Sequence, residues 1–343
     1  MPTIDEQLAK HEAAVIWQRR KSPLGGNDTA VKPGIQMGLR LLLGQGSQSS
    51  TAQRANAVRD HVQTIVRKRT EVMVKITGHN PDMAGFARSL DYVSRSGRYK
   101  HKAEESLELE DDAGQIYRGL QGREMLRRAW TLGGPSVPEA VVLPPGVDRK
   151  KAQRQILKII YSMPAHVGRD SVTAAARAAI KETFSRHQFV MAHHADTDNH
   201  HTHLLIKMVD MDGHRMNPRK ADLQVWRDEF ANQLNLRGIE AAATRRRVRL
   251  KREKGVSQAV REMRARGVVP SRDSSAQTQP RAAQVAREND ARMLGLYADI
   301  AQTLRASPDP MDRALADKLV TTLKTQGHSL PVGIKPNAPR PSL

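Results

Sequence analysis

Five of the chain's 13 histidines lie within eleven residues, HHADTDNHHTH at 193–203. Two of them, His201 and His203, are two positions apart at the start of an apolar run that predicts a β-strand. Because alternate residues of a strand point to one face, their side chains leave that face roughly 6 to 7 Å apart. His194 ends the preceding predicted strand, and a short turn would return the chain alongside it. Three imidazoles from neighbouring strands predict an open metal site with exchangeable positions.

Of the other polar residues in this segment, one has a predicted role at the metal site and two histidines do not. Asp196 can accept the second N–H of a ligand or help to take a proton. His193 and His200 fall out of phase with the inward face, so we expect them not to be ligands. Solvated loop histidines or an expression tag are the alternative interpretations. The following apolar run, LLIKMV, argues against a tag because it places the cluster in a core strand.

Hydrophobic periodicity predicts the elements that must position these histidines. The predicted strands cover 71–78, 156–163, 187–194 and 201–209, and predicted helices cover 51–68 and 82–95 and follow Ser171 and Asn217. Between them, 101–150 is charged and then rich in proline, which predicts hairpins and loops. This order favours an α+β or open α/β fold in which helices pack against one face of a sheet.

Charge and cysteine content limit the class of partner and the compartment. The chain carries 56 Lys and Arg against 36 Asp and Glu, a formal net charge of +20. This excess indicates a polyanion, with nucleic acid favoured over an anionic membrane and a basic protein without such a partner as the alternative. The absence of cysteine excludes disulfides and thiolate chemistry and is compatible with the cytoplasm. No apolar stretch approaches the roughly 18 to 20 residues of a membrane span, so we expect no membrane insertion.

Changes in composition divide the chain into three predicted segments. Residues 1–70 are an N-terminal arm with a helix, 71–243 the domain with the sheet, and 244–343 a basic helical extension with a flexible tail. The stretch 244–267 holds ten basic residues against two acidic ones. We expect its basic part to grip flanking nucleic acid or contact accessory proteins.

The histidine pattern also carries a family resemblance. His194-x-Asp196-x4-His201-x-His203 with its apolar continuation resembles the three-histidine motif of HUH endonucleases. The wider segment from YSMPAHVGRDS to HHTHLLIK resembles the P-type relaxases of conjugative and mobilizable plasmids, a family that includes the agrobacterial T-DNA border endonuclease. Many members have proline where this chain has His200, a departure that affects the turn and not a ligand. The resemblance covers about 71–245 and implies a relaxase domain with a central antiparallel sheet.

This resemblance implies a tyrosine nucleophile, and the chain has five tyrosines. Tyr92 lies in SLDYVSRSGR, which resembles the family's first motif, and it falls off the apolar stripe of the predicted helix 82–95. A phenol has an ordinary pKa near 10, so a metal or a base must favour its ionised form. Tyr99 is the nearest alternative, and Tyr161 is predicted to lie in a strand core. A metal-bound water, with Tyr92 only lining the groove, also stays open.

Basic residues follow the candidate nucleophile at once. Arg95, Arg98 and Lys100 suit phosphate contacts around a scissile position, although a solvated charged loop would have the same composition. Asp91 precedes Tyr92 and could tune its proton.

The resemblance implies a DNA relaxase that nicks one strand at a plasmid origin of transfer, leaving a 5′-phosphotyrosyl adduct and a free 3′-hydroxyl. It implies Mg²⁺ or Mn²⁺, whereas three imidazoles alone would equally suit Zn²⁺. The implied partners are single-stranded DNA, relaxosome accessory proteins and a type IV secretion coupling protein. The implied location is the bacterial cytoplasm, with translocation alongside the DNA into a recipient cell.

Three other functions remain open from the sequence. A rolling-circle replication initiator would use the same chemistry. A non-enzymatic basic DNA-binding accessory protein would hold a structural metal, but structural sites normally have four protein ligands and no fourth is evident. A metal-dependent hydrolase of small molecules is disfavoured by the charge of +20.

Overall fold

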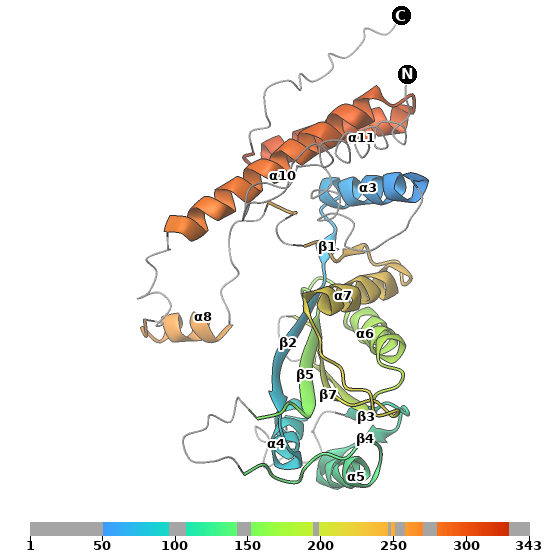
Figure 1. The fold of residues 1–343 in the computed structure, drawn as a ribbon, viewed down its shortest axis with the longest axis vertical. Coiled ribbons are helices and arrows are strands. Elements are labelled where there is room, and N and C mark those ends of the chain that lie inside the picture. Colours follow the sequence, from blue (N-terminus) through green and yellow to red (C-terminus); the bar gives the residue numbers. More distant parts are fainter. Residues whose placement is uncertain are drawn as a thin grey trace, which may run out of the picture. The chain divides into compact units, whose positions relative to one another are not determined.

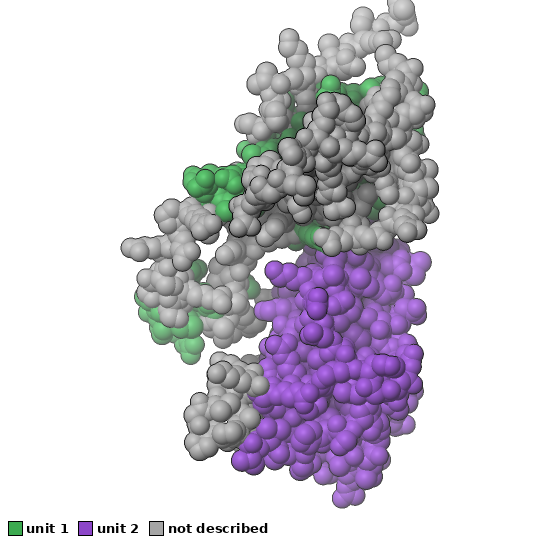
Figure 2. Space-filling view, in the orientation of Figure 1, with its two compact units in different colours: residues 1–68, 244–343 green, residues 69–243 purple. Residues whose placement is uncertain are grey.

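The computed structural model describes residues 51–95, 108–142, 152–194, 199–245, 248–250, 258–269 and 280–328. The chain divides into two compact units (Figure 2). We call residues 69–243 the sheet unit, and residues 1–68 together with 244–343 the helical unit. Among the described helices, none combines the length and the apolar character that crossing a membrane requires.

The sheet unit is built on a six-stranded antiparallel sheet (Figure 1). In spatial order its strands are β2 (Met73–Asn80), β5 (Ile156–Ser162), β7 (His201–Lys207), β6 (Phe189–His194), β3 (Leu109–Asp111) and β4 (Ile116–Tyr117). A separate parallel pair joins β1 (Thr70–Glu71) to β8 (Ala241–Ala242). The predicted α+β class with a central antiparallel sheet is therefore confirmed.

Helices cover both faces of this sheet, whereas the sequence predicted helices on one face. On the first face lie α6 (Arg169–Thr183) and α7 (Lys220–Asn235), packed on Phe189, Met191, Leu204 and Ile206. On the second face lie α4 (Met83–Val93) and α5 (Gly119–Leu132), packed on Val190, Ala192 and Leu205. The central strands carry apolar side chains at consecutive positions, so both faces need covering. Helix α5 was missed within the predicted loop region, because only Leu126 and Trp130 among its large apolar side chains are buried.

A buried lysine attaches α5 to the sheet. Lys207 lies at the end of β7, and its ammonium donates hydrogen bonds to the carbonyls of Trp130, Gly133 and Pro135 at 2.8–2.9 Å. Burial lowers the pKa of Lys207 to about 8, although Asp112 opposes the shift. The three carbonyls lie at the C-terminal end of α5 and just after it. The last carbonyls of a helix have no hydrogen-bond donor within the helix, and Lys207 supplies one.

On the first face, a buried carboxylate joins β3 to α6. Glu110 is 5% exposed, and it accepts hydrogen bonds from Arg177 Nε at 2.6 Å and Lys181 Nζ at 3.1 Å. The Nε2 atom of His193 lies 3.7 Å from the same carboxylate. Burial alone would raise the pKa of Glu110, but His193, Arg177 and Lys181 outweigh it and lower the pKa to about 2. This ionic cluster fixes α6 against β3 and β6.

The helical unit contains α3 (Thr51–Val66), α8 (Gln258–Ala265), α10 (Pro280–Ala306) and α11 (Pro310–Thr325). Helices α3, α10 and α11 share an apolar core that includes Val58, Val62, Leu296, Ile300, Leu304, Leu319 and Leu323. Tyr297 is buried in this core and donates a 2.6 Å hydrogen bond to the carbonyl of Val248.

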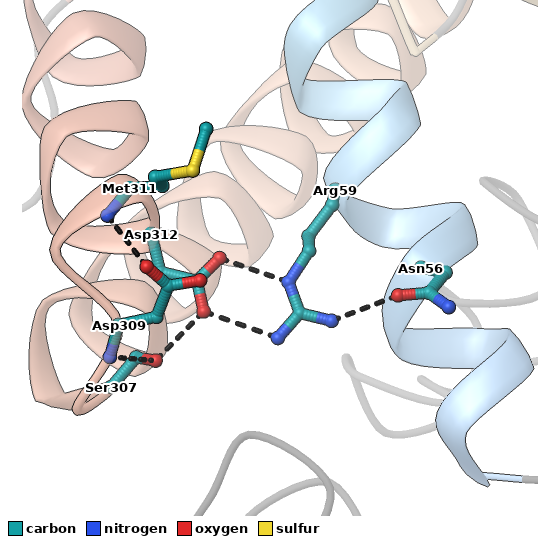
Figure 3. Close-up of polar contacts among 6 residues, drawn as sticks. All are labelled: Asn56, Arg59, Ser307, Asp309, Met311 and Asp312. Atoms are coloured by element: carbon teal, nitrogen blue, oxygen red, sulfur yellow. Dashed lines mark hydrogen bonds and ion pairs between the residues drawn. The ribbon is translucent and has the colours of Figure 1, made fainter.

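One polar cluster connects α3 to α11 (Figure 3). Arg59 donates to both carboxylate oxygens of Asp312, at 2.9 and 3.1 Å, and Ser307 Oγ donates to the same carboxylate at 2.7 Å. Burial of Asp312 would raise its pKa, but Arg59 and Ser307 hold the pKa below its ordinary value. A segment close to the N-terminus is thereby bonded to one near the C-terminus.

Replacing Asp312 by asparagine should lower the free energy of unfolding of the helical unit by roughly 1 to 3 kcal/mol, because a neutral amide cannot accept all three of these bonds. Hydrogen exchange of the α3 and α11 amides measures the loss. Asp317→Asn on the same helix is the control, since its pair with Arg305 is more exposed and should contribute less. Equal losses in the two variants would contradict this ranking.

Replacing Glu110 by glutamine should destabilise the sheet unit by roughly 1 to 3 kcal/mol at neutral pH. The folded pKa of about 2 lies below the ordinary 4.5, so the stabilisation is complete above about pH 4.5 and is lost as the pH falls toward 2. Urea unfolding across this range should show wild type and variant converging at the acidic end. Glu108→Gln, which breaks an exposed pair with Arg118, should cause little change at any pH.

Candidate metal centre

The pairing of β6 with β7 assembles a cluster of three histidines. His194 lies directly opposite His201, and His203 lies opposite Ala192. All three therefore project from the second face of the sheet. Their ring centroids are 4.8, 4.5 and 5.0 Å apart, and each offers a nitrogen within 4.8 Å of the others.

Backbone carbonyls orient two of these rings. His194 Nε2 lies 2.6 Å from the carbonyl oxygen of Val93, and His201 Nδ1 lies 2.9 Å from that of Asn199. A carbonyl can only accept a hydrogen bond, so in each ring the nitrogen that faces it carries the proton. The other nitrogen of each ring then keeps its lone pair for a metal ion.

The electrostatic environment keeps His203 neutral. Burial is the main cause that lowers its pKa, to about 2, and His194, His201, Arg95 and Lys158 lower it further. Neutral imidazole is the form that binds metal, so no proton has to leave this ring. Three imidazole nitrogens at these distances fit a divalent ion with positions left for another ligand. Among the residues that the structure describes, this group has three members and no fourth.

An exposed tyrosine lies next to this cluster. Tyr92 is 63% exposed, and its ring meets that of His203 edge-on, with centroids 5.7 Å apart and an interplanar angle of 89°. Its helix α4 is held at the other end by Asp82, which accepts hydrogen bonds from the backbone N–H groups of Gly85 and Val141. An exposed tyrosine side chain thus contacts the ring of a candidate metal ligand.

The other described tyrosines lie elsewhere. Tyr161 is buried on the first face against Phe230, as predicted for a strand core. Tyr297 is buried in the helical unit. The hydroxyl of Tyr117 donates to Asp111, and burial together with that carboxylate raises the pKa of Tyr117 to about 12. Tyr99 lies outside the described residues.

Several other predicted site residues can also be located. Asp196, Arg98 and Lys100 fall outside the described residues, so their predicted roles stay predictions. Arg95 follows α4 with a φ of 61°, and its charge contributes to lowering the pKa of His203. Asp91 forms a 2.8 Å ion pair with Arg123 of α5.

The two histidines expected not to be ligands lie outside the cluster of three. His193 projects from the first face, where its Nδ1 lies 2.8 Å from the hydroxyl of Thr202. His200 immediately precedes β7, and its carbonyl accepts a hydrogen bond from the backbone N–H of Met163.

Two features of the site were missed by sequence reasoning. The carbonyl of Val93 carries no sequence signal, because every residue has one. Lys158 did carry a signal: it alternates with Leu157, Ile159 and Tyr161 on β5, which places it on the same face as His203. Together, a three-nitrogen site, an exposed phenol and nearby cations can bind a phosphate ester and supply a nucleophile to it.

Part of the chain matches a known protein family. Residues 147–236 match the family described as "Relaxase: MobA/VirD2-like, nuclease domain". No curated protein and no solved structure matches the chain. The matched residues include β5, α6, β6, β7 and α7, and thus the three clustered histidines, whereas Tyr92 precedes them. By this match, residues 147–236 are similar to the nuclease domain of MobA/VirD2-like relaxases.

Proposed function

We propose that this protein is a relaxase that nicks one DNA strand at a plasmid origin of transfer and becomes attached to the cut end through Tyr92. The observation that carries the proposal is the position of Tyr92, exposed to solvent and in edge contact with His203. A catalytic phenol must be accessible to a phosphodiester and close to whatever stabilises charge on it. Among the described tyrosines, Tyr92 is the one that meets both conditions.

In the proposed reaction the Tyr92 oxygen attacks phosphorus. The new bond joins the phenol oxygen to phosphorus, and the bond to the 3′ oxygen breaks. The phenol gives up its proton, the 3′ oxygen gains one, and the products are a 5′-phosphotyrosyl strand and a free 3′-hydroxyl. The phosphodiester is exchanged for another ester, so the 3′-hydroxyl can later reverse the cut. This polarity rests on the family resemblance, and Asp196 stays the predicted proton acceptor.

Three groups of residues would bind the metal ion, orient the histidine rings and bind the DNA phosphates in this reaction. His194, His201 and His203 would hold a divalent ion, Mg²⁺ or Mn²⁺ by resemblance, which would stabilise charge on a non-bridging phosphate oxygen. The carbonyls of Val93 and Asn199 keep two of the rings turned with a lone pair available. Arg95, with Arg98 and Lys100 further along the chain, would bind phosphates beside the scissile bond.

The wider biological role is proposed on the family resemblance. The substrate would be single-stranded DNA at the origin of transfer, presented with relaxosome accessory proteins. A type IV secretion coupling protein would then receive the enzyme and its DNA in the bacterial cytoplasm for transfer to a recipient cell. An accessory protein with a structural metal is less well supported, because the described histidine cluster has three members and an exposed tyrosine beside it.

Replacing Tyr92 by phenylalanine should abolish covalent attachment, with at least a roughly 100-fold loss, because the attacking oxygen is removed. The assay uses a labelled single-stranded oligonucleotide from the transfer origin of the chain's own plasmid with Mn²⁺, and scores a protease-sensitive adduct on a gel. Tyr117→Phe is the control and should keep the adduct. Loss of the adduct in Tyr99→Phe but not in Tyr92→Phe would identify Tyr99 as the nucleophile. Cleavage without any adduct would indicate attack by water.

Replacing His203 by alanine should weaken binding of Mn²⁺ by roughly 100-fold or more, since loss of a ligand costs at least as much as loss of its supporting contacts. Isothermal titration calorimetry of the full chain measures this without DNA. His214→Ala is a matched control in a second acidic and histidine group, formed with Asp210 and Asp212. If His214→Ala weakened binding and His203→Ala did not, the metal would be at that second group.

A further inference from the structure

Two lysines lie on the same face of the sheet as the histidine cluster, on the side toward β2. Lys75 of β2 pairs with Ile160 of β5, and Ile160 pairs with His203 of β7. The three residues form one row across the sheet, so Lys75 begins about 10 Å, or two strand spacings, from His203. Lys158 lies two residues from Ile160 on the same face, a diagonal separation of about 7 to 8 Å from His203.

Because Gly78 has no side chain, the end of the Lys158 side chain can lie close to the backbone of β2. A Cβ atom at Gly78 would lie 3.0 Å from Lys158 Cε and 3.6 Å from its Nζ. The pairing of β2 with β5 shifts register between Ile76 and Gly78, which places Gly78 opposite Lys158. The end of the lysine side chain therefore lies over Gly78, where a methyl group would require it to shift by a few tenths of an ångström and a larger side chain would take its place.

The charge of these two lysines is not neutralised within the described part of the chain. Neither ammonium has an ion-pair or hydrogen-bond partner there, whereas Lys181 pairs with Glu110 and Lys207 is bonded to three carbonyls. Lys75 is exposed and Lys158 is half-buried. Burial is the main cause that lowers the pKa of His79, and the charges of Arg154 and Lys158, which lie along this edge of the sheet, lower it further.

Apolar side chains lie between the cations on this face. Ile160 is half-buried between Lys75 and His203. Met73, two residues before Lys75 on β2, is 47% exposed. A surface that offers cations and apolar contacts together suits a strand whose phosphates and unstacked bases are both accessible. Duplex DNA would present its phosphates but keep its bases stacked.

We infer that Lys75 and Lys158 bind backbone phosphates of the single strand next to the scissile phosphate, with Gly78 holding the space that Lys158 needs. The strand would cross β5 and β2 on its way from the histidine cluster. This inference rests on the proposed function, since it concerns the same substrate, and it extends the site to residues outside the histidine and Tyr92 segments.

The test measures binding of a fluorescent single-stranded oligonucleotide to the full chain carrying Tyr92→Phe, which prevents turnover. Each phosphate contact on a single strand contributes about 0.7 to the slope of log affinity against log salt. Lys158→Gln and Lys75→Gln should each lower that slope by about 0.7 and weaken binding about fivefold at 0.1 M salt, the factor that this slope gives relative to 1 M. Lys181→Gln, on the opposite face, is the control and should leave the slope unchanged.

A variant at Gly78 tests the position of the Lys158 ammonium without changing the net charge of the protein. Gly78→Leu should weaken binding in the presence of Lys158, because a branched side chain would occupy the space over Gly78 in which the end of the lysine now lies. In the Lys158→Gln background it should have no further effect, so the two changes are non-additive in a double-mutant cycle. Additive losses would mean that Gly78 does not act through the lysine and would overturn that part of the inference.

The outcomes also separate this inference from the proposed function. If both lysine variants bind with the affinity and salt slope of the Lys181→Gln control, the inference is wrong, even where the chain with Tyr92 intact forms its adduct. If the chain with Tyr92 intact forms no adduct and no variant binds single-stranded DNA, the proposed function fails and the inference with it.

Discussion

The antiparallel register between β6 and β7 is the constraint on which the rest of the site depends. It sets His194 opposite His201 and Ala192 opposite His203, which brings three imidazoles to one face. A slip of one residue in either strand would turn that strand's histidines to the other face, among the side chains that pack on α6 and α7. The apolar residues on both faces of these strands oppose such a slip. Core packing and the candidate metal centre are thus determined by the same set of hydrogen bonds.

The C-terminal turn of α4 couples the candidate nucleophile to the histidine cluster. Tyr92 contacts His203 through its ring, and the next residue, Val93, accepts the His194 N–H through its carbonyl. Val93 is buried against the second face of the sheet, so the helix end cannot shift without disturbing both contacts. The ion pair between Asp91 and Arg123 adds a connection from the same turn to α5. Correct docking of α4 is therefore needed for both the orientation of the His194 ring and the position of the Tyr92 phenol.

Cations on the first face of the sheet unit are paired with a carboxylate, whereas two lysines on the second face are not paired within the described residues. On the first face Glu110 neutralises cations of α6, and its contacts hold its own pKa at about 2. On the second face Lys75 and Lys158 have no such partner within the described residues, and Lys158 contributes to keeping His203 neutral. Burial first, and then the cations near the histidine cluster, thus favour the neutral, metal-binding form of His203. The same cations would attract a polyanionic substrate.

The sequence by itself determined the α+β class, the strands that carry the histidines, and the relation of this segment to relaxases, because periodicity and spacing are local properties of the chain. It also predicted that Tyr161 lies in a strand core, and the structure confirms this burial. Tertiary structure decided that helices cover both faces, that a carbonyl 101 residues from His194 orients its ring, and that Arg59 pairs with Asp312 across 253 residues. It also decided which lysines lie on the same face of the sheet as the histidine cluster. These contacts depend on how distant segments pack, and neither hydrophobic period nor charge count contains that information.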